Sequence, residues 1–157
     1  MKKIILFLTL ILSLRAIEFK ETKFIEAFEL ETYRYGTVQY STKKTVIQYK
    51  DGKTITKTGD EVTVHNQKGT LLASINLLKK PQMRLYFELT QALFSKKFDT
   101  LKKNFMITKQ HLKYIFQPKG DTAHIINGIE LRLNSDGSVV YFIIDFKNKD
   151  NIKIETL

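Results

Sequence analysis

The 157-residue sequence contains no cysteine, no tryptophan and only two prolines. The lack of cysteine excludes a disulfide framework, a thiol nucleophile and a lipid-modified N-terminal cysteine. The composition is otherwise that of a folded protein, because 43% of the residues are hydrophobic and 11% are aromatic. This length suits a single domain with a hydrophobic core of its own.

Signatures of catalysis are missing too. The histidines His65, His111 and His124 lie far apart in the sequence and have neither HExxH nor His-x-His spacing. No G-x-S-x-G motif is present, so the chain lacks that type of serine nucleophile turn. Glu130 and Asp145 are carboxylates that neighbouring strands could bring together, but the sequence does not give their separation. We expect a protein that is not an enzyme and that has no catalytic residue, metal site or cofactor.

The first 16 residues, MKKIILFLTLILSLRA, have the features of a secretory signal peptide. Lys2 and Lys3 precede an apolar run over residues 4–12, and Ala16 is a small residue suited to the cleavage site. A membrane anchor is the weaker alternative, because this run is shorter than the roughly 20 residues needed to span a bilayer. We expect cleavage after Ala16, a location outside the cytoplasm and a single mature domain over residues 17–157.

Basic residues outnumber acidic ones, with 26 lysines and arginines against 16 aspartates and glutamates. The formal net charge of +10 would fall to +7 in the mature chain, because the signal removes three basic residues and no acidic ones. Lysines are spread along the chain, which indicates a solvated basic surface or a weak attraction to anionic membrane surfaces. An exported chain without a recognition motif is a poor partner for nucleic acid. We expect a monomer.

The segment Lys80–Phe98, KPQMRLYFELTQALFSKKF, is the one long stretch with a clear helical pattern. Pro81 suits the first turn, where its missing N–H costs nothing. The polar residues of this segment share one narrow stripe, formed by Arg84, Glu88, Gln91 and Ser95. The apolar face is therefore about twice the usual width of roughly 100°, so a curved surface must wrap the helix. The helix is either the plain core helix of an α+β domain or a lid that shares an apolar concavity with a ligand.

Segments on either side of this helix alternate as antiparallel strands. Within Tyr33–Leu78, the hairpin turns Asp51–Gly52 and Gly59–Asp60 separate short strands that each have one apolar face. After the helix the strands are NFMITK, HLKYIFQPK, AHIINGIELRLN, SVVYFIIDF and the segment from Asn151 to Leu157. SVVYFIIDF is apolar on both faces, so we expect it to be the most buried strand, with Asp145 near the interior. Lys23–Thr32 is expected to begin as a short helix and then to become a strand.

These segments amount to about nine to eleven strands interrupted once by a helix. The pattern predicts a mainly β fold with an open, curved antiparallel sheet rather than a two-layer α+β sandwich. In this order the parts resemble the periplasmic outer-membrane lipoprotein carriers, the LolA-like proteins. The resemblance rests on the signal, the strand opened by Gly36-Thr37-Val38, the two hairpin turns, the aromatic-rich helix, YIFQPK, and the closing series IELRLN, SDG, VVYFIIDF and IKI. It covers nearly the whole mature chain and implies a mainly β fold with a helical lid, an open (unclosed) curved antiparallel β-barrel with helices on the concave face.

The resemblance implies a periplasmic chaperone that carries acylated lipoproteins from the inner to the outer membrane, shielding their acyl chains in an apolar cavity. The implied partners are acylated lipoproteins as cargo, an inner-membrane ABC-type release complex and an outer-membrane acceptor. The family's lid-latching arginine has no match here. Ser41-Thr42-Lys43-Lys44 follows Gly36-Thr37-Val38 where an Arg-Pro pair would stand.

An acyl-chain cavity requires apolar side chains from both the helix and the sheet, around a void on the order of several hundred Å³. The candidate lining residues are Tyr40, Ile47, Tyr49, Val62, Val64, Met83, Phe87, Leu89, Leu93 and Phe94. Periodicity alone does not separate lining from ordinary core packing. The alternative function is a non-enzymatic envelope module that binds a polypeptide, a glycan or a glycolipid, with the helix as plain core.

Overall fold

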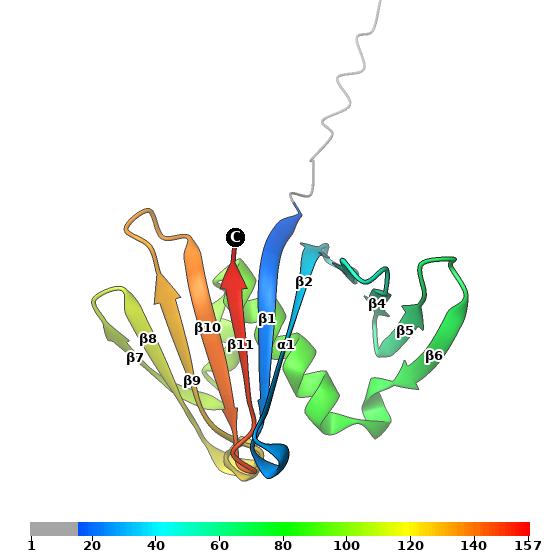
Figure 1. Ribbon diagram of the computed structural model, residues 1–157. Coiled ribbons are helices and arrows are strands. Elements are labelled where there is room, and N and C mark those ends of the chain that lie inside the picture. Colours follow the sequence, from blue (N-terminus) through cyan, green and yellow to red (C-terminus); the bar gives the residue numbers. More distant parts are fainter. Residues whose placement is uncertain (1–15) are drawn as a thin grey trace, which may run out of the picture.

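Eleven antiparallel strands form one continuous sheet in the computed structural model, which describes residues 16–157 (Figure 1). The strands are β1 (Ile17–Ile25), β2 (Leu30–Tyr40), β3 (Lys44–Tyr49), β4 (Thr54–Thr58), β5 (Glu61–His65), β6 (Leu71–Asn76), β7 (Phe105–Gln110), β8 (Lys113–Pro118), β9 (Ile126–Leu133), β10 (Val139–Phe146) and β11 (Asn151–Thr156). Their spatial order is β6-β5-β4-β3-β2-β1-β11-β10-β9-β8-β7. β6 and β7 are the two edges and do not pair with each other, so the sheet stays open. The expected signal peptide lies, except for Ala16, outside the described residues.

Two meanders meet at the centre of this sheet. β1 to β6 follow one another outward on one side, and β7 to β11 follow one another inward on the other. The first and last strands therefore pair, with Phe19 opposite Thr156 and Phe24 opposite Asn151. The turn between β3 and β4 contains Gly52 with a φ of +90°, a left-handed conformation that glycine adopts without steric cost.

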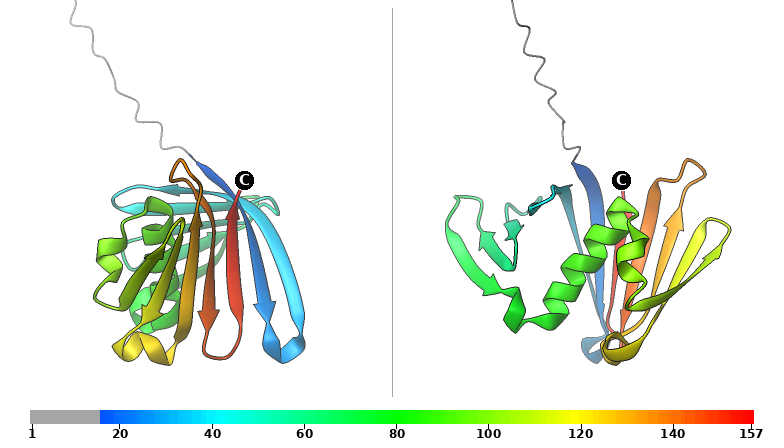
Figure 2. Two further views of the ribbon diagram at one scale, coloured as in Figure 1. Left: turned by 90° about the vertical axis from the view of Figure 1, so that its left-hand side faces the viewer. Right: turned by 180° about the vertical axis from the view of Figure 1, so that it is seen from behind.

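The chain crosses from edge strand β6 to edge strand β7 through the concave side of the sheet. The crossing consists of the 3-10 helix η2 (Leu77–Lys79), α1 (Pro81–Ser95) and the 3-10 helix η3 (Phe98–Leu101). Figure 2 shows α1 lying across the concave face. The predicted fold class, an open curved antiparallel sheet with a helix on its concave face, is confirmed. Over residues 16–157, no helix combines the length and the hydropathy needed to cross a membrane.

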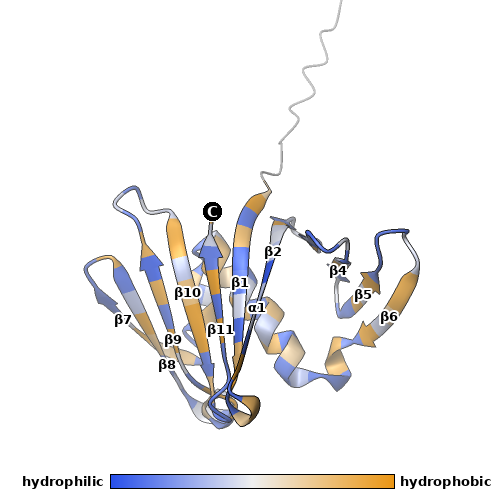
Figure 3. Ribbon diagram, in the orientation of Figure 1, coloured by the Kyte–Doolittle hydropathy of each residue, from blue (hydrophilic) through white to orange (hydrophobic). Residues whose placement is uncertain are grey.

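The C-terminal half of α1 packs into the core of the domain. Phe94 contacts Phe19, Tyr40 and Phe142, with ring centroids 6.5, 5.9 and 5.1 Å apart. Leu93 is fully buried beside it. Hydropathy alternates along the strands, as Figure 3 shows, because successive side chains point to the concave and the convex face in turn. One side of the sheet can therefore form a core while the other is hydrated.

The expected helical start of residues 23–32 was wrong. β1 already runs through Ile25, only the single turn η1 (Glu26–Phe28) is helical, and β2 begins at Leu30. The residues of β1 pair with β2 on one side and β11 on the other, and these ladder hydrogen bonds outweigh a local helical preference. Phe28 is 77% exposed at the hairpin tip.

The expectation that Asp145 lies near the interior was also wrong. Strand periodicity puts Phe142 and Ile144 on the concave face, where both are fully buried. Asp145 falls on the convex face with Ile143 and is exposed. The acid that is buried is Glu21 on β1, with 5% of its surface exposed.

Candidate functional site

A cavity of about 620 Å³ lies between the N-terminal half of α1 and the concave face of the sheet. Its apolar wall consists of Ile47, Ile55, Val62, Val64, Ile75, Met83 and Phe87. The sheet residues of this wall share one face because they are cross-strand neighbours, with Ile47 opposite Ile55 and Ile55 opposite Val64. The volume lies within the range of about 300–1,000 Å³ that is usual for small-molecule sites. The concavity is thus filled under the C-terminal half of α1 and hollow under its N-terminal half.

The structure divides the ten predicted lining residues into two groups. The residues that border the cavity are Ile47, Tyr49, Val62, Val64, Met83 and Phe87. The residues that do not border it are Tyr40, Leu89, Leu93 and Phe94, all of which belong to the packed core or contact it. Helical periodicity identifies which face of α1 points inward, but it does not show which end of that face meets an empty space.

Other residues of the cavity were not among the predicted ones. The apolar additions are Ile55, Ile75, Ile125, Phe146 and Ile152, and the polar additions are Glu21, Lys23, Arg34, Gln82, Tyr86, His124, Lys147, Asn148 and Asp150. A signal for Ile55 and Ile75 was available, since both are in phase with the apolar face of their strands. The polar residues had no such signal, because β1, β2 and the β10–β11 turn become neighbours only in the folded sheet.

Glu21 is the centre of a hydrogen-bond network on the wall of the cavity. Arg34 on β2 donates from Nη2 to Glu21 Oε1 at 2.6 Å. The hydroxyls of Tyr49 and Tyr86 donate to Glu21 Oε2 at 3.3 and 3.0 Å. The Arg34 guanidinium also lies 4.1 Å from the centroid of the Tyr49 ring, a cation–π distance. Both carboxylate oxygens are therefore occupied, which offsets the cost of burying this charge.

The network fixes the protonation of its members. Burial, followed by the neighbouring Glu21 carboxylate, raises the pKa of Tyr86 well above its ordinary value, so the hydroxyl stays a donor. Burial and Glu21 act in the same direction on the pKa of Tyr49. For Arg34, burial alone would lower the pKa, but the bond to Glu21 and the charges around it raise it, so the guanidinium stays charged. α1 is thus joined to the sheet by the neutral hydroxyl of Tyr86, which donates to Glu21.

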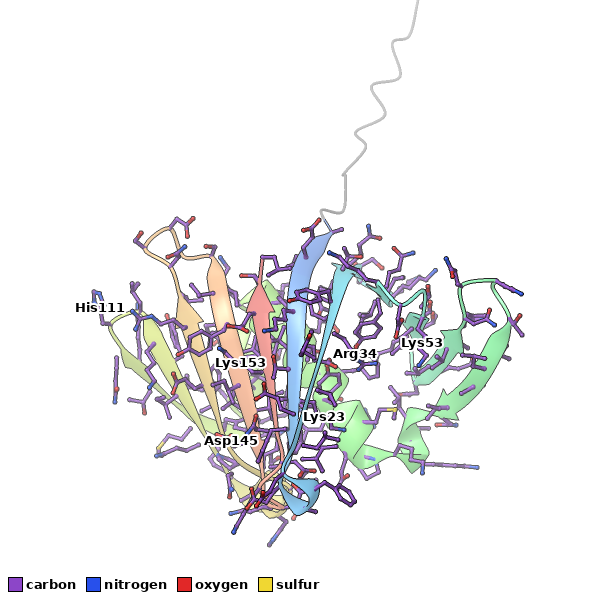
Figure 4. The ribbon with its side chains drawn as sticks, viewed as in Figure 1. Lys23, Arg34, Lys53, His111, Asp145 and Lys153 are labelled. Carbon is purple, nitrogen blue, oxygen red and sulfur yellow. The ribbon has the colours of Figure 1, made fainter. Side chains whose placement is uncertain are left out.

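The cavity combines apolar and charged side chains. The lining is apolar along β3 to β6 and α1, and it includes charged side chains from β1, β2 and the β10–β11 turn. Figure 4 labels two of them, Lys23 on β1 and Arg34 on β2. Within the described part of the chain, no group of three histidine, aspartate or glutamate side chains is placed to hold a metal ion. An elongated molecule with a polar end fits such a shape.

No family model matches the sequence, and neither does any curated protein. Among solved structures, the chain is similar to the Mycobacterium tuberculosis lipoprotein LppX, with 13% identity, a TM-score of 0.48, and 92% of this chain and 86% of LppX covered. It is also similar to the LolA superfamily protein NE2245 from Nitrosomonas europaea, with 7% identity, a TM-score of 0.38, and 92% and 85% of the two chains covered. Similarities at this level concern the course of the chain alone, and membership of the lipoprotein-carrier family remains a prediction from the sequence.

Proposed function

We propose that this protein binds acyl chains of lipids or lipoproteins in the cavity under α1 and shields them from water. The observation that carries the proposal is the apolar hollow itself, since close-packed interiors rarely leave a space of about 620 Å³. At roughly 30 Å³ per methylene, about the volume of a liquid water molecule, this space holds on the order of 20 methylene groups. It therefore has room for one long chain. Each buried methylene contributes about 0.8 kcal/mol.

Within this class we propose a carrier that takes acylated lipoproteins from the inner to the outer membrane. The support is the sequence resemblance to the LolA-like proteins together with the position of α1 over the cavity. An inner-membrane ABC-type release complex and an outer-membrane acceptor are the partners that this role requires. A cargo with two or three chains exceeds the space present, so loading requires α1 to move away from the sheet.

The proposal is tested by filling the cavity without changing the strand that borders it. Val64 lines the cavity, whereas Thr63 is the adjacent residue of β5 and points to the convex face. We expect Val64→Trp to abolish the binding of an apolar dye and the pickup of an acylated lipoprotein from membranes. Thr63→Trp should leave both unchanged, and both variants should keep a native circular dichroism spectrum.

Lipid content gives the decisive outcome. Native mass spectrometry and solvent extraction of the gently purified protein should detect bound lipid. If the protein carries no lipid, accepts no lipoprotein and binds no apolar dye, the carrier function is wrong. The remaining function would then be an envelope module that binds a polypeptide or a glycan.

A further inference from the structure

The charged end of the cavity has an imbalance between acids and bases. Its two acids are Glu21 and Asp150, and its permanently basic residues are Lys23, Arg34 and Lys147. Both oxygens of Glu21 accept hydrogen bonds from Arg34 and the two tyrosines described above. The oxygens of Asp150 are also occupied, since Oδ1 accepts from the backbone N–H of Glu26 at 3.0 Å and Oδ2 from Asn148 at 2.7 Å.

The basic side chains, in contrast, have few partners within the protein. Over residues 16–157, Lys23 and Lys147 form no ion pair and no side-chain hydrogen bond, and Arg34 donates only from Nη2. The Arg34 side chain is 44% exposed, and its Nε and Nη1 form no hydrogen bond with the described residues. Unused donors and uncompensated positive charge at the end of an apolar cavity form a site for an anion.

The three basic residues lie on one side of the cavity. Glu21 pairs with Arg34 across β1 and β2, and Lys23 is the next residue of β1 on the same face (Figure 4). Lys147 enters from the turn after β10, held there by a backbone hydrogen bond of 2.9 Å from its N–H to the carbonyl of Ile125. An anionic group placed among them would be next to Ile125 and Ile152, where the apolar lining continues.

We propose that the ligand is an anionic amphiphile, with an acyl chain in the apolar part and a carboxylate or phosphate head at Lys23, Arg34 and Lys147. This inference rests on the proposed acyl-chain binding and adds the chemistry of the head. Of the lipids and lipoproteins proposed above as sources of the acyl chain, it favours free lipids with an anionic head. The acids of the cavity do not pair with Lys23 or Lys147, because the oxygens of Glu21 and Asp150 accept hydrogen bonds from other groups.

Three probes with the same chain and different heads test the inference, namely dodecanoate, monododecyl phosphate and dodecanol. The affinity of each probe is measured by its displacement of a neutral apolar dye from the purified protein, in low and in high salt. We expect both anions to bind about tenfold more tightly than dodecanol in low salt, because each of the three cations at this partly exposed site contributes a modest interaction energy. This difference in affinity should become smaller in high salt, because salt screens the charges. Inorganic phosphate without a chain should not displace the dye.

Variants that remove one positive charge show which lysines contribute to anion binding. Lys23→Gln and Lys147→Gln should each weaken anion binding about two- to fivefold and leave dodecanol binding unchanged. Lys20→Gln is the matched control, because Lys20 lies on β1 but points to the convex face, 5.4 Å from the Tyr33 ring. Lys20→Gln should change none of the affinities.

The outcomes separate the two proposals. If the three heads bind equally, or if Lys20→Gln weakens anion binding as much as Lys23→Gln, the anionic site is wrong while acyl-chain binding stands. If inorganic phosphate alone displaces the dye, the site recognises a free anion and the amphiphile is wrong. If no probe with a chain binds, both proposals fail.

Discussion

The Tyr86 hydroxyl donates a 3.0 Å hydrogen bond to Glu21 Oε2 and so joins α1 to the central strand β1. This bond holds the N-terminal half of α1, which covers the cavity. The C-terminal half is held by aromatic packing around Phe94. The helix is therefore attached in two different ways along its length. A hydrogen bond is directional and is lost when its two atoms separate. We therefore expect the N-terminal half of α1 to be the part that moves when a ligand enters.

Removal of this bond should loosen the N-terminal half of α1. Tyr86→Phe keeps the ring but leaves Glu21 with one donor fewer, and we expect a loss of about 1–2 kcal/mol in the free energy of unfolding. Dye uptake should become faster, because less energy is needed to lift the helix. Denaturant unfolding and stopped-flow dye binding measure the two effects. Tyr33→Phe, at a ring that is 64% exposed, is the control; equal effects of both variants would show that the bond does not hold the helix.

The two halves of α1 should respond differently to truncation. Leu93 is fully buried in the core, so Leu93→Ala should destabilise the protein by about 2–5 kcal/mol. Met83 is partly buried and faces the cavity, so Met83→Ala should cost less than about 1.5 kcal/mol and widen the ligand space. Denaturant titrations and the length of the longest acyl chain bound test this difference. Equal losses of stability would mean that the N-terminal half of α1 packs on a filled core.

Alkaline pH should unfold the protein through its buried tyrosines. Burial is the main cause that raises the pKa values of Tyr40, Tyr49 and Tyr86 above the ordinary value. A group whose pKa is raised in the folded state stabilises it fully below the unfolded pKa, about 10 for tyrosine, and this contribution is lost as the pH rises toward the folded value. Stability should therefore fall above about pH 10.

Tyrosinate absorbance tests this prediction. Tyr40, Tyr49 and Tyr86 should ionise only as the circular dichroism signal of the fold disappears. Tyr86→Phe should make the loss of stability with pH less steep, since one group with a raised pKa is removed. Complete ionisation of all seven tyrosines in a protein with a native spectrum would contradict the prediction.

The local sequence pattern predicts much of the architecture. The turns at Asp51–Gly52 and Gly59–Asp60, the alternating strands and the start of α1 at Pro81 all depend on neighbours close in sequence, and the structure has them where the sequence predicts. The wide apolar face of α1 also indicated a concave partner. These features are encoded in periodicity and turn chemistry, which act over a few residues.

The division of the concavity into a filled and a hollow half was decided by the tertiary structure. Leu93 and Met83 lie on one helix and carry similar apolar side chains, yet one is in the core and the other faces the cavity, because the curved sheet approaches α1 unevenly along its length. The meeting of Glu21, Arg34 and Tyr86 likewise depends on the pairing of β1 with β2 and on the path of α1 across the sheet. A local pattern states which way a side chain points, but only the packed chain determines what it meets there.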